Sequence, residues 1–183
     1  LTGDDGVVSM SIIRHFKASS EERVAYLKMR RAVAGLADDA ELPDDEDTNA
    51  NASISPERYA EMSASENLIL TITANGAGKL SSSHDYPLRG RGGIGVSAMD
   101  KAMRGGRLLA CFPVELDDQI MLATSNGQSI RVPVEGISFR SRSAGGVRVF
   151  NTAKGEEVVS VAWIADQGDQ EEAIEGEPEA GES

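Results

Sequence analysis

The sequence predicts an all-β protein built from propeller-like blades, and three observations indicate this. Residues 67–164 contain an internal repeat with an offset of 51 residues. Each copy holds short runs rich in β-branched and apolar residues, as strands are. In each copy an Asn-Gly dipeptide, Asn75-Gly76 or Asn126-Gly127, follows the first run and suits a tight hairpin. A repeat of about 50 residues with four strands is typical of one propeller blade.

The repeat extends beyond the hairpins. At the same offset 69–76 matches 120–127, Arg89 matches Arg140, Arg91 matches Arg142, Gly95-Val96 matches Gly146-Val147, Leu108 matches Val159 and Phe112 matches Trp163. Chance similarity between two β-rich stretches would not reproduce turns, arginines and Gly-Val steps in one register. We therefore expect a penultimate blade over 67–116 and a last blade over 117–165.

Each blade is expected to contain four strands of its own. They fall near 67–74, 78–82, 94–99 and 107–114 in the first copy, and near 118–125, 128–134, 145–150 and 157–164 in the second. The dipeptides Gly105-Gly106 and Lys154-Gly155 mark a second turn in each copy.

The beginning of the chain resembles the end of a repeat. Residues 7–13 read like 158–164, so we expect 1–13 to be the last strand of a truncated blade. Because the first residue is Leu1 and not Met, we expect the chain to be the C-terminal piece of a longer protein. Residues 14–66 break the β pattern as a helical and acidic insertion. Within it Ser19 and Glu22 form a capping box that predicts a short helix near 20–34.

The net charge of −12 is unevenly distributed along the chain. Residues 35–66 hold ten acidic and one basic side chain, and 165–183 hold eight acidic and none basic. The stretch 67–164 is mildly basic, with eleven Lys and Arg against eight Asp and Glu. Since acidic tracts this poor in large apolar residues cannot offset ordering entropy, we expect most of 37–55 and the tail 166–183 to be disordered.

Few residues suggest catalytic or metal chemistry. One cysteine and two histidines cannot form a disulfide or a structural zinc site, and no apolar run is long enough to span a membrane. These features indicate a soluble protein of a reducing compartment. We expect Cys111 and Trp163 to pack in the core, His84 to lie in a solvated turn, and the Asp117-Asp118 pair to be solvated charge without a metal.

Repeated arginines are the strongest functional signal. In 89–95 glycines separate Arg89 from Arg91, and Arg140 and Arg142 occupy the same place in the second copy. No strand-turn-helix pattern surrounds the glycines, which excludes a dinucleotide site. A solvated loop is the simpler interpretation, but recurrence on successive blades favours a track that contacts DNA phosphates. Lys79, Arg131 and Arg148 are weaker candidates for the same role.

The chain resembles the C-terminal part of the A subunit of bacterial DNA gyrase, a type IIA topoisomerase. The segments that carry the resemblance are 70–79, Asp85-Tyr86-Pro87, Gly93-Ile94-Gly95-Val96, 118–127, 145–149 and 157–161. The acidic tail also fits, whereas the 14–66 insertion resembles insertions of only some members. The segment 89–95 is at best a degenerate copy of the family's basic box, since Ile94 stands where the box has lysine.

This resemblance implies the last blades of a β-pinwheel that wraps double-stranded DNA and supports ATP-dependent negative supercoiling. It implies a cytoplasmic A2B2 holoenzyme with the gyrase B subunit and a second A subunit. ATP and Mg would bind elsewhere in that holoenzyme, so no cofactor is expected in this chain. The cleavage tyrosine would lie upstream, because Tyr26, Tyr59 and Tyr86 lack its context.

Two other functions remain open at this point. The C-terminal domain of the topoisomerase IV subunit has similar blades, and a non-enzymatic propeller that binds proteins would have the same repeat length. The role of the acidic tail is also open. It could compete with DNA phosphates for the blade arginines, or it could only keep the protein soluble.

Overall fold

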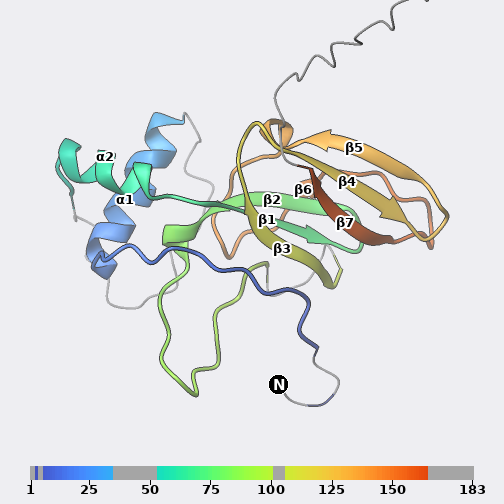
Figure 1. The fold of residues 1–183 in the computed structure, drawn as a ribbon, viewed down its shortest axis with the longest axis horizontal. Coiled ribbons are helices and arrows are strands. Elements are labelled where there is room, and N and C mark those ends of the chain that lie inside the picture. Colours follow the sequence, from blue (N-terminus) through green and yellow to red (C-terminus); the bar gives the residue numbers. More distant parts are fainter. Residues whose placement is uncertain (1–2, 4–5, 35–52, 101–105, 165–183) are drawn as a thin grey trace, which may run out of the picture.

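The structure is a computed structural model that describes residues 3, 6–34, 53–100 and 106–164. In these residues seven strands form two antiparallel sheets, and two helices lie beyond one end of the first sheet (Figure 1). The expected mainly β architecture is confirmed. None of the described helices is long and apolar enough to cross a membrane.

The helices and strands follow one another along the chain. They are α1 (Ser20–Val33), α2 (Pro56–Ala64), β1 (Leu68–Thr73), β2 (Ala77–Ser82), the 3-10 helix η1 (Ser83–Asp85), β3 (Leu108–Val114), β4 (Gln119–Thr124), β5 (Ser129–Pro133), the 3-10 helix η2 (Val134–Gly136), β6 (Val147–Arg148) and β7 (Val158–Ile164). The Asn-Gly hairpins are confirmed, since Gly76 and Gly127 have φ values of 75° and 80°.

Strand pairing reproduces the repeat. Leu68 lies opposite Ser82 between β1 and β2, and Gln119 lies opposite Pro133 between β4 and β5, an offset of 51 on both strands. The same two residues of β1 and β4 face Val114 of β3 and Ile164 of β7, which are only 50 apart. The last strands of the two repeats are therefore shifted by one residue relative to the sequence match.

This shift corrects the prediction for Trp163. Leu70 faces Phe112, and the corresponding Met121 faces Ala162, so Trp163 corresponds to Pro113 and not to Phe112. A shift of one residue moves a side chain to the other face of a strand. Trp163 is accordingly 56% exposed and is not a core residue.

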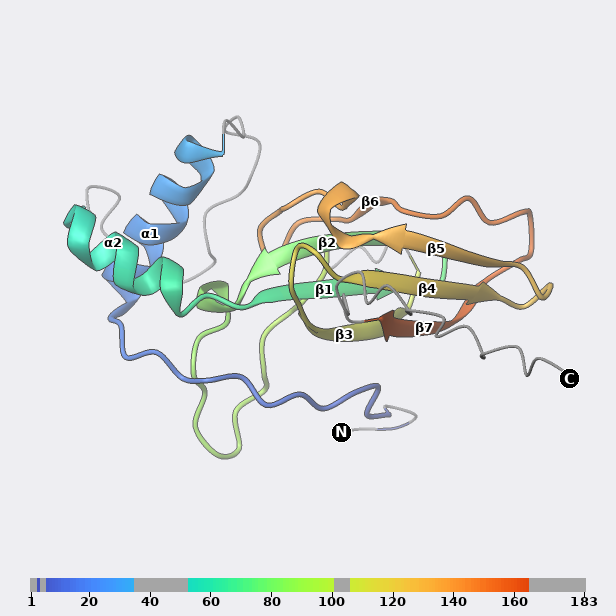
Figure 2. The ribbon, with the colours of Figure 1, turned by 45° about the horizontal axis from the view of Figure 1, so that its top comes forward.

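The expectation of four strands from each repeat is wrong. The first sheet has the order β3-β1-β2-β6, and β6 belongs to the second repeat (Figure 2). Val147 and Arg148 of β6 pair with Gly78 and Ala77 of β2. The corresponding segment 94–99 forms no strand. By analogy it needs the second strand of a preceding repeat, which the described residues do not contain.

The N-terminal segment also differs from expectation. Residues 6–13 form no strand and run alongside β3, where the Ser9 hydroxyl donates to the carbonyl of Cys111 at 2.8 Å. The similar strand β7 pairs with β4. Within the described part of the chain, both edges of β1 and of β4 are already occupied, so 7–13 finds no equivalent partner.

One apolar core joins the two sheets. Its buried members come from β1, β2, β3, β4, β7 and the η2 segment, and include Leu70, Ile72, Leu80, Ile120, Leu122 and Val158. β3 lies beside β7, and the Val158 amide donates to the carbonyl of Ala74 at 2.8 Å. The two repeats therefore share a core and are not independent bodies.

The helices pack on a second, smaller core. At the start of α1, the Glu22 amide donates to the Ser19 hydroxyl at 3.1 Å and the Ser19 amide donates to the Glu22 carboxylate at 2.8 Å, which confirms the capping box. α2 was not predicted, although Ser55 caps it and a proline opens its first turn. Tyr26, Leu27 and Met62 are buried between the helices. Most of the acidic stretches expected to be disordered, 37–52 and 166–183, lie outside the described residues.

Candidate nucleic-acid interface

Two neighbouring loops carry exposed arginines. The loop that follows η1 carries Arg89 and Arg91, and the segment that follows η2 carries Arg140. The Arg140 amide donates to the Leu80 carbonyl of β2 at 2.8 Å, and the Leu80 amide donates to the Ser138 carbonyl at 3.0 Å. The second repeat's cationic segment therefore lies along the strand that leads into the first repeat's cationic loop.

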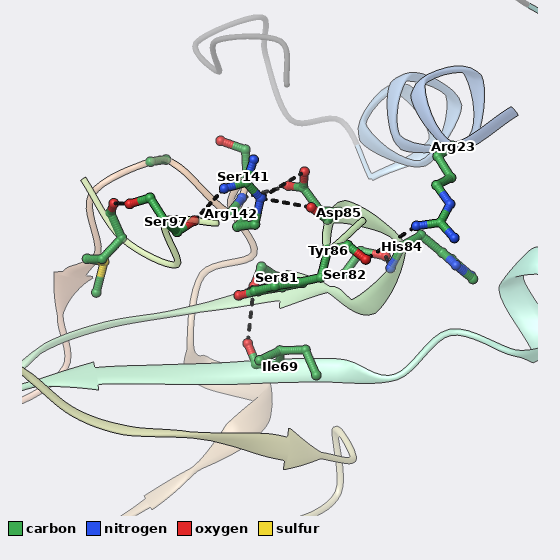
Figure 3. A network of polar contacts seen from close by, with 12 residues as sticks. Arg23, Ile69, Ser81, Ser82, His84, Asp85, Tyr86, Ser97, Ser141 and Arg142 are labelled. Atoms are coloured by element: carbon green, nitrogen blue, oxygen red, sulfur yellow. Dashed lines mark hydrogen bonds and ion pairs between the residues drawn. The ribbon is translucent and has the colours of Figure 1, made fainter. Parts of the chain in front are cut away.

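Arg142 ties the two loops together from inside. Its backbone amide donates to a carboxylate oxygen of Asp85 at 2.7 Å, and its Nε donates to the Asp85 carbonyl at 2.8 Å. Its Nη1 donates to the carbonyl of Ser97 (Figure 3). Asp85 and Ser97 stand at the two ends of the loop that carries Arg89 and Arg91. The side chain of Arg142 is therefore engaged inside the protein, not exposed as the sequence suggested.

Asp85 is buried within this junction. Burial raises the pKa of its carboxyl group, and the amide and guanidinium of Arg142 oppose that rise. The Arg142 Nε lies 3.9 Å from the second carboxylate oxygen, so the pair is also ionic. A buried charge pair that is hydrogen-bonded on both sides fixes geometry, because separating it would leave an uncompensated charge.

Lys79 is buried in the same junction. It lies on β2, and its Nζ donates to the carbonyls of Ser141, Arg142 and Ala144 at 2.9, 2.5 and 2.6 Å. All three N–H groups of the ammonium are used, and its solvent exposure is zero. Lys79 therefore holds the Arg140 segment against β2 and has no surface with which to meet a phosphate.

The remaining predicted cations lie elsewhere. Arg131 is exposed on β5 of the second sheet, opposite Met121. Arg148 is exposed on β6, pairs in register with Ala77 at the opposite end of β2 from η1, and donates to the Asn151 side chain at 3.2 Å. The structure thus joins the ends of the loop that carries Arg89 and Arg91 to the segment that carries Arg140, whereas Arg131 and Arg148 lie on β5 and β6.

His84 joins the helical insertion to the first repeat, which corrects its prediction as a solvated residue. It is buried, and its Nε2 lies 2.8 Å from the Met62 carbonyl of α2. The rings of Tyr26 and Phe16 meet it edge-on at 5.0 and 5.7 Å. Burial lowers the pKa of its imidazole. The insertion is therefore fastened to η1, at the base of the Arg89 loop.

Arginines of the insertion also make contacts that attach it to the repeats. Arg30 forms an ion pair with Glu66 at 2.7 Å, and its guanidinium lies 4.1 Å from the ring centre of Phe139. Arg23 donates to the Tyr86 carbonyl at 3.3 Å. These contacts join α1 to both repeats.

The two aspartates before β4 are not equivalent. Asp118 is buried, and its carboxylate accepts from the Glu115 amide and from the Trp163 indole, both at 2.7 Å. This corrects its prediction as solvated charge, whereas Asp117 is exposed. Cys111 is half-buried with its thiol 3.9 Å from the Thr71 hydroxyl, and burial raises its pKa.

The described residues gather no three His, Cys, Asp or Glu side chains that could hold a metal ion. The exposed arginines Arg89, Arg91 and Arg140 can make ionic contact with a polyanion. One sequence signal could have revealed the buried lysine. Position 130, which corresponds to Lys79, is isoleucine, so the two repeats differ at a site inside the hairpin.

The sequence of this chain is similar to those of known proteins. The family model described as the DNA gyrase C-terminal domain, beta-propeller, matches residues 67–115 and 118–162. The DNA gyrase A subunit of Granulibacter bethesdensis is 39% identical over 95% of this chain, and that of Rickettsia bellii is 37% identical over all of it. The chain spans only 20% of the length of each.

A solved structure has a similar fold. The structure of a DNA gyrase A C-terminal domain superposes with a TM-score of 0.51 and 23% identity, over 55% of this chain and 34% of that one. The family match covers both repeats, including the hairpins and the cationic segments. The chain therefore belongs to the DNA gyrase C-terminal domain family.

Proposed function

We propose that this chain is a DNA-wrapping part of a gyrase A subunit, and that Arg89, Arg91 and Arg140 contact the phosphates of double-stranded DNA. The observation that carries this proposal is that Arg142 bonds to both ends of the loop that carries Arg89 and Arg91, which joins the arginine-bearing segments of successive repeats. Cations fixed in this way neutralise successive phosphates without reading bases.

The whole protein's role follows from the same proposal. Its relatives are gyrase A subunits, so we infer a cytoplasmic holoenzyme with gyrase B and a second A subunit that supercoils DNA with ATP. The named relatives favour gyrase over topoisomerase IV or a protein-binding propeller. In this proposal the chain presents DNA and does not cleave it. The buried hydroxyl of Tyr26 and the Tyr86 hydroxyl, 3.1 Å from that of Ser81, support this.

The test is a salt series on the full-length protein. Replacing Arg89, Arg91 and Arg140 with alanine should lower DNA affinity and reduce the slope of log affinity against log salt by about 0.9 for each phosphate that is no longer neutralised. Replacing the same three residues with lysine keeps the charges and should preserve the slope. If the alanine variant retains the wild-type slope, these arginines do not contact DNA.

In the alanine variant of Arg89, Arg91 and Arg140, negative supercoiling should decline together with DNA wrapping, whereas DNA cleavage should persist.

The tyrosines of this chain are expected to take no part in cleavage. We expect Tyr26→Phe, Tyr59→Phe and Tyr86→Phe to leave the covalent DNA–protein adduct intact. Loss of the adduct in any one of them would overturn the non-catalytic assignment.

A further inference from the structure

Lys79 shapes the segment that carries Arg140. The three carbonyls that accept from its Nζ come from Ser141, Arg142 and Ala144, within four consecutive residues. The chain therefore curves around the ammonium group directly after Arg140. The Ser141 carbonyl also accepts from the Ala144 amide at 3.2 Å, so the Arg142 and Ala144 carbonyls depend most on Lys79, and buried carbonyls without a donor are costly.

We propose that protonated Lys79 is a positioning residue, whose ammonium group fixes the backbone of 140–144 and so places Arg140 beside the loop of Arg89 and Arg91 for contact with DNA. The inference rests on the proposed DNA-binding function. The inference goes beyond that function because Lys79 acts through Arg140 and does not itself contact DNA.

The number of N–H groups makes this role dependent on the proton. An ammonium group offers three donors, one for each carbonyl, whereas a neutral amine offers two donors and a lone pair. The lone pair would face the third carbonyl oxygen and repel it. Loss of the proton should therefore release one side of the 140–144 segment without exposing the apolar core.

The surroundings of Lys79 lower its pKa, so that the ammonium group loses its proton closer to neutral pH than an exposed lysine does. Burial lowers its pKa to about 8. Asp85 of η1, Cys111 of β3 and Asp100 of the preceding loop favour the charged form, and Arg142 disfavours it. In the unfolded chain the pKa returns to the ordinary value of 10.5.

As pH rises, the free energy of unfolding should change in the opposite direction to DNA affinity. Between about pH 8 and 10.5 the unfolded chain keeps a proton that the folded chain has lost. The sign of this linkage means that the free energy of unfolding falls as pH drops through the window and rises as pH increases through it. A fall in DNA affinity with rising pH over the same window cannot then be explained by Lys79 unfolding the protein.

The experiment measures affinity of the full-length protein for a DNA duplex from about pH 7 to about pH 9.5 at constant ionic strength. The wild type should lose about fivefold in affinity, the upper end of what one exposed ion pair contributes. Lys79→Met should bind about fivefold more weakly at pH 7 and show a flat profile. Lys154→Met removes an exposed lysine and should keep the wild-type profile.

A double-mutant cycle tests whether Lys79 acts through Arg140. In an Arg140→Ala background, Lys79→Met should cause no further loss. A further fivefold loss, or a wild-type affinity that is constant with pH, overturns the proposal. The pH profile of the wild type needs no variant, so the test survives if Lys79→Met fails to fold.

Hydrogen exchange separates this proposal from the proposed function. The amides of 142–146 should exchange faster in Lys79→Met and in the wild type above about pH 8, after correction for intrinsic exchange rates, whether or not DNA binds there. Unchanged exchange contradicts the positioning role. Faster exchange together with unchanged affinity in the Arg89, Arg91 and Arg140 alanine variant would instead indicate that the DNA-binding proposal is wrong.

Discussion

The two hairpins have the same pairing but different surroundings. β1 pairs with β2 in the register in which β4 pairs with β5. Five of the six residues of β2 are buried, whereas four of the five residues of β5 are exposed. β2 is covered by β6 and by the Arg140 segment, and no described residue pairs with the outer edge of β5. The repeated sequence sets the pairing, and the neighbouring repeat sets the burial.

Lys79 and Ile130 show this difference at one position. The lysine has no solvent exposure, whereas the isoleucine is 39% exposed. This reverses the usual distribution of charged and apolar residues. The reason is that the β2 site meets three backbone carbonyls, and an apolar side chain could donate to none of them.

The largest expected effect comes from equivalent substitutions in the two first strands. Leu70→Ala should lower the free energy of unfolding by about 3 kcal/mol, because a fully buried leucine leaves a cavity. Met121→Ala, at the matching position, should cost less than about 1 kcal/mol because Met121 is 40% exposed. Urea unfolding of the chain measures both. Equal losses would contradict the difference in burial.

The exchange of β6 is tested by two adjacent glycines. A Cβ on Gly146 would meet the backbone of Gly78 at 2.8 Å, whereas a Cβ on Gly145 meets its nearest atom at an ordinary 3.8 Å. Gly146→Ala should therefore lower stability by about 2 kcal/mol, since β6 must move away from β2. Gly145→Ala is the control and should be close to neutral. If both variants have wild-type stability, β6 does not pack closely on β2.

Trp163 tests the shifted register of the last strand. Trp163→Phe removes the indole hydrogen bond to Asp118 from an exposed side chain, so we expect a loss of about 1 kcal/mol. A core position, as the sequence match with Phe112 implied, would give about 3 kcal/mol or more for Trp163→Ala. Urea denaturation of both variants distinguishes the two registers.

The smallest effect is a pH dependence confined to the first repeat. The folded pKa of His84 is lowered by burial, so the unfolded chain binds the proton more readily. Stability from this group should therefore be lost as pH falls from about 6.5 through the folded pKa. The raised pKa of Asp85 contributes in the opposite direction at lower pH. Unfolding is best compared between about pH 7.5 and about pH 5.5.

Matched variants isolate the contribution of His84. His84→Gln should flatten this part of the profile. Glu135→Gln changes the corresponding exposed residue of the second repeat and should leave the profile unchanged. A wild-type slope in the His84→Gln variant would assign the pH dependence to other groups.

Local signals predicted the local structure of this chain. The Asn-Gly dipeptides identified both hairpins, and Ser19 with Glu22 identified α1, because each signal and its structure lie within a few residues. The start of α2 carried a similar signal in Ser55 and Pro56, which the acidic composition around it obscured. Strand exchange had no local signal, since pairing of β2 with β6 depends on residues about 70 positions apart.

In the candidate site too, local features were predicted from the sequence and long-range contacts were not. Arg89, Arg91 and Arg140 were identified by their recurrence and are exposed. Arg142 recurs equally well, yet its surroundings come from Asp85 and Ser97, far away in the sequence. Lys79 and His84 were misjudged for the same reason. Residue type and spacing predict which side chains are charged, whereas burial depends on which segments meet.

Strand exchange has a consequence for how such a gene can gain or lose modules. Removing 117–165, one repeat as the sequence defines it, would remove β6 from its place beside β2 and leave the Lys79 ammonium without its three carbonyls. Removing the 51 residues 95–145 would also remove these carbonyls, but it would keep β6 and join Ile94 to Gly146. β6 would still pair with β2, and β7 would take the place of β3 beside β1. Recombination that preserves a foldable protein should therefore have its crossover points inside the cationic loops, not between the repeats.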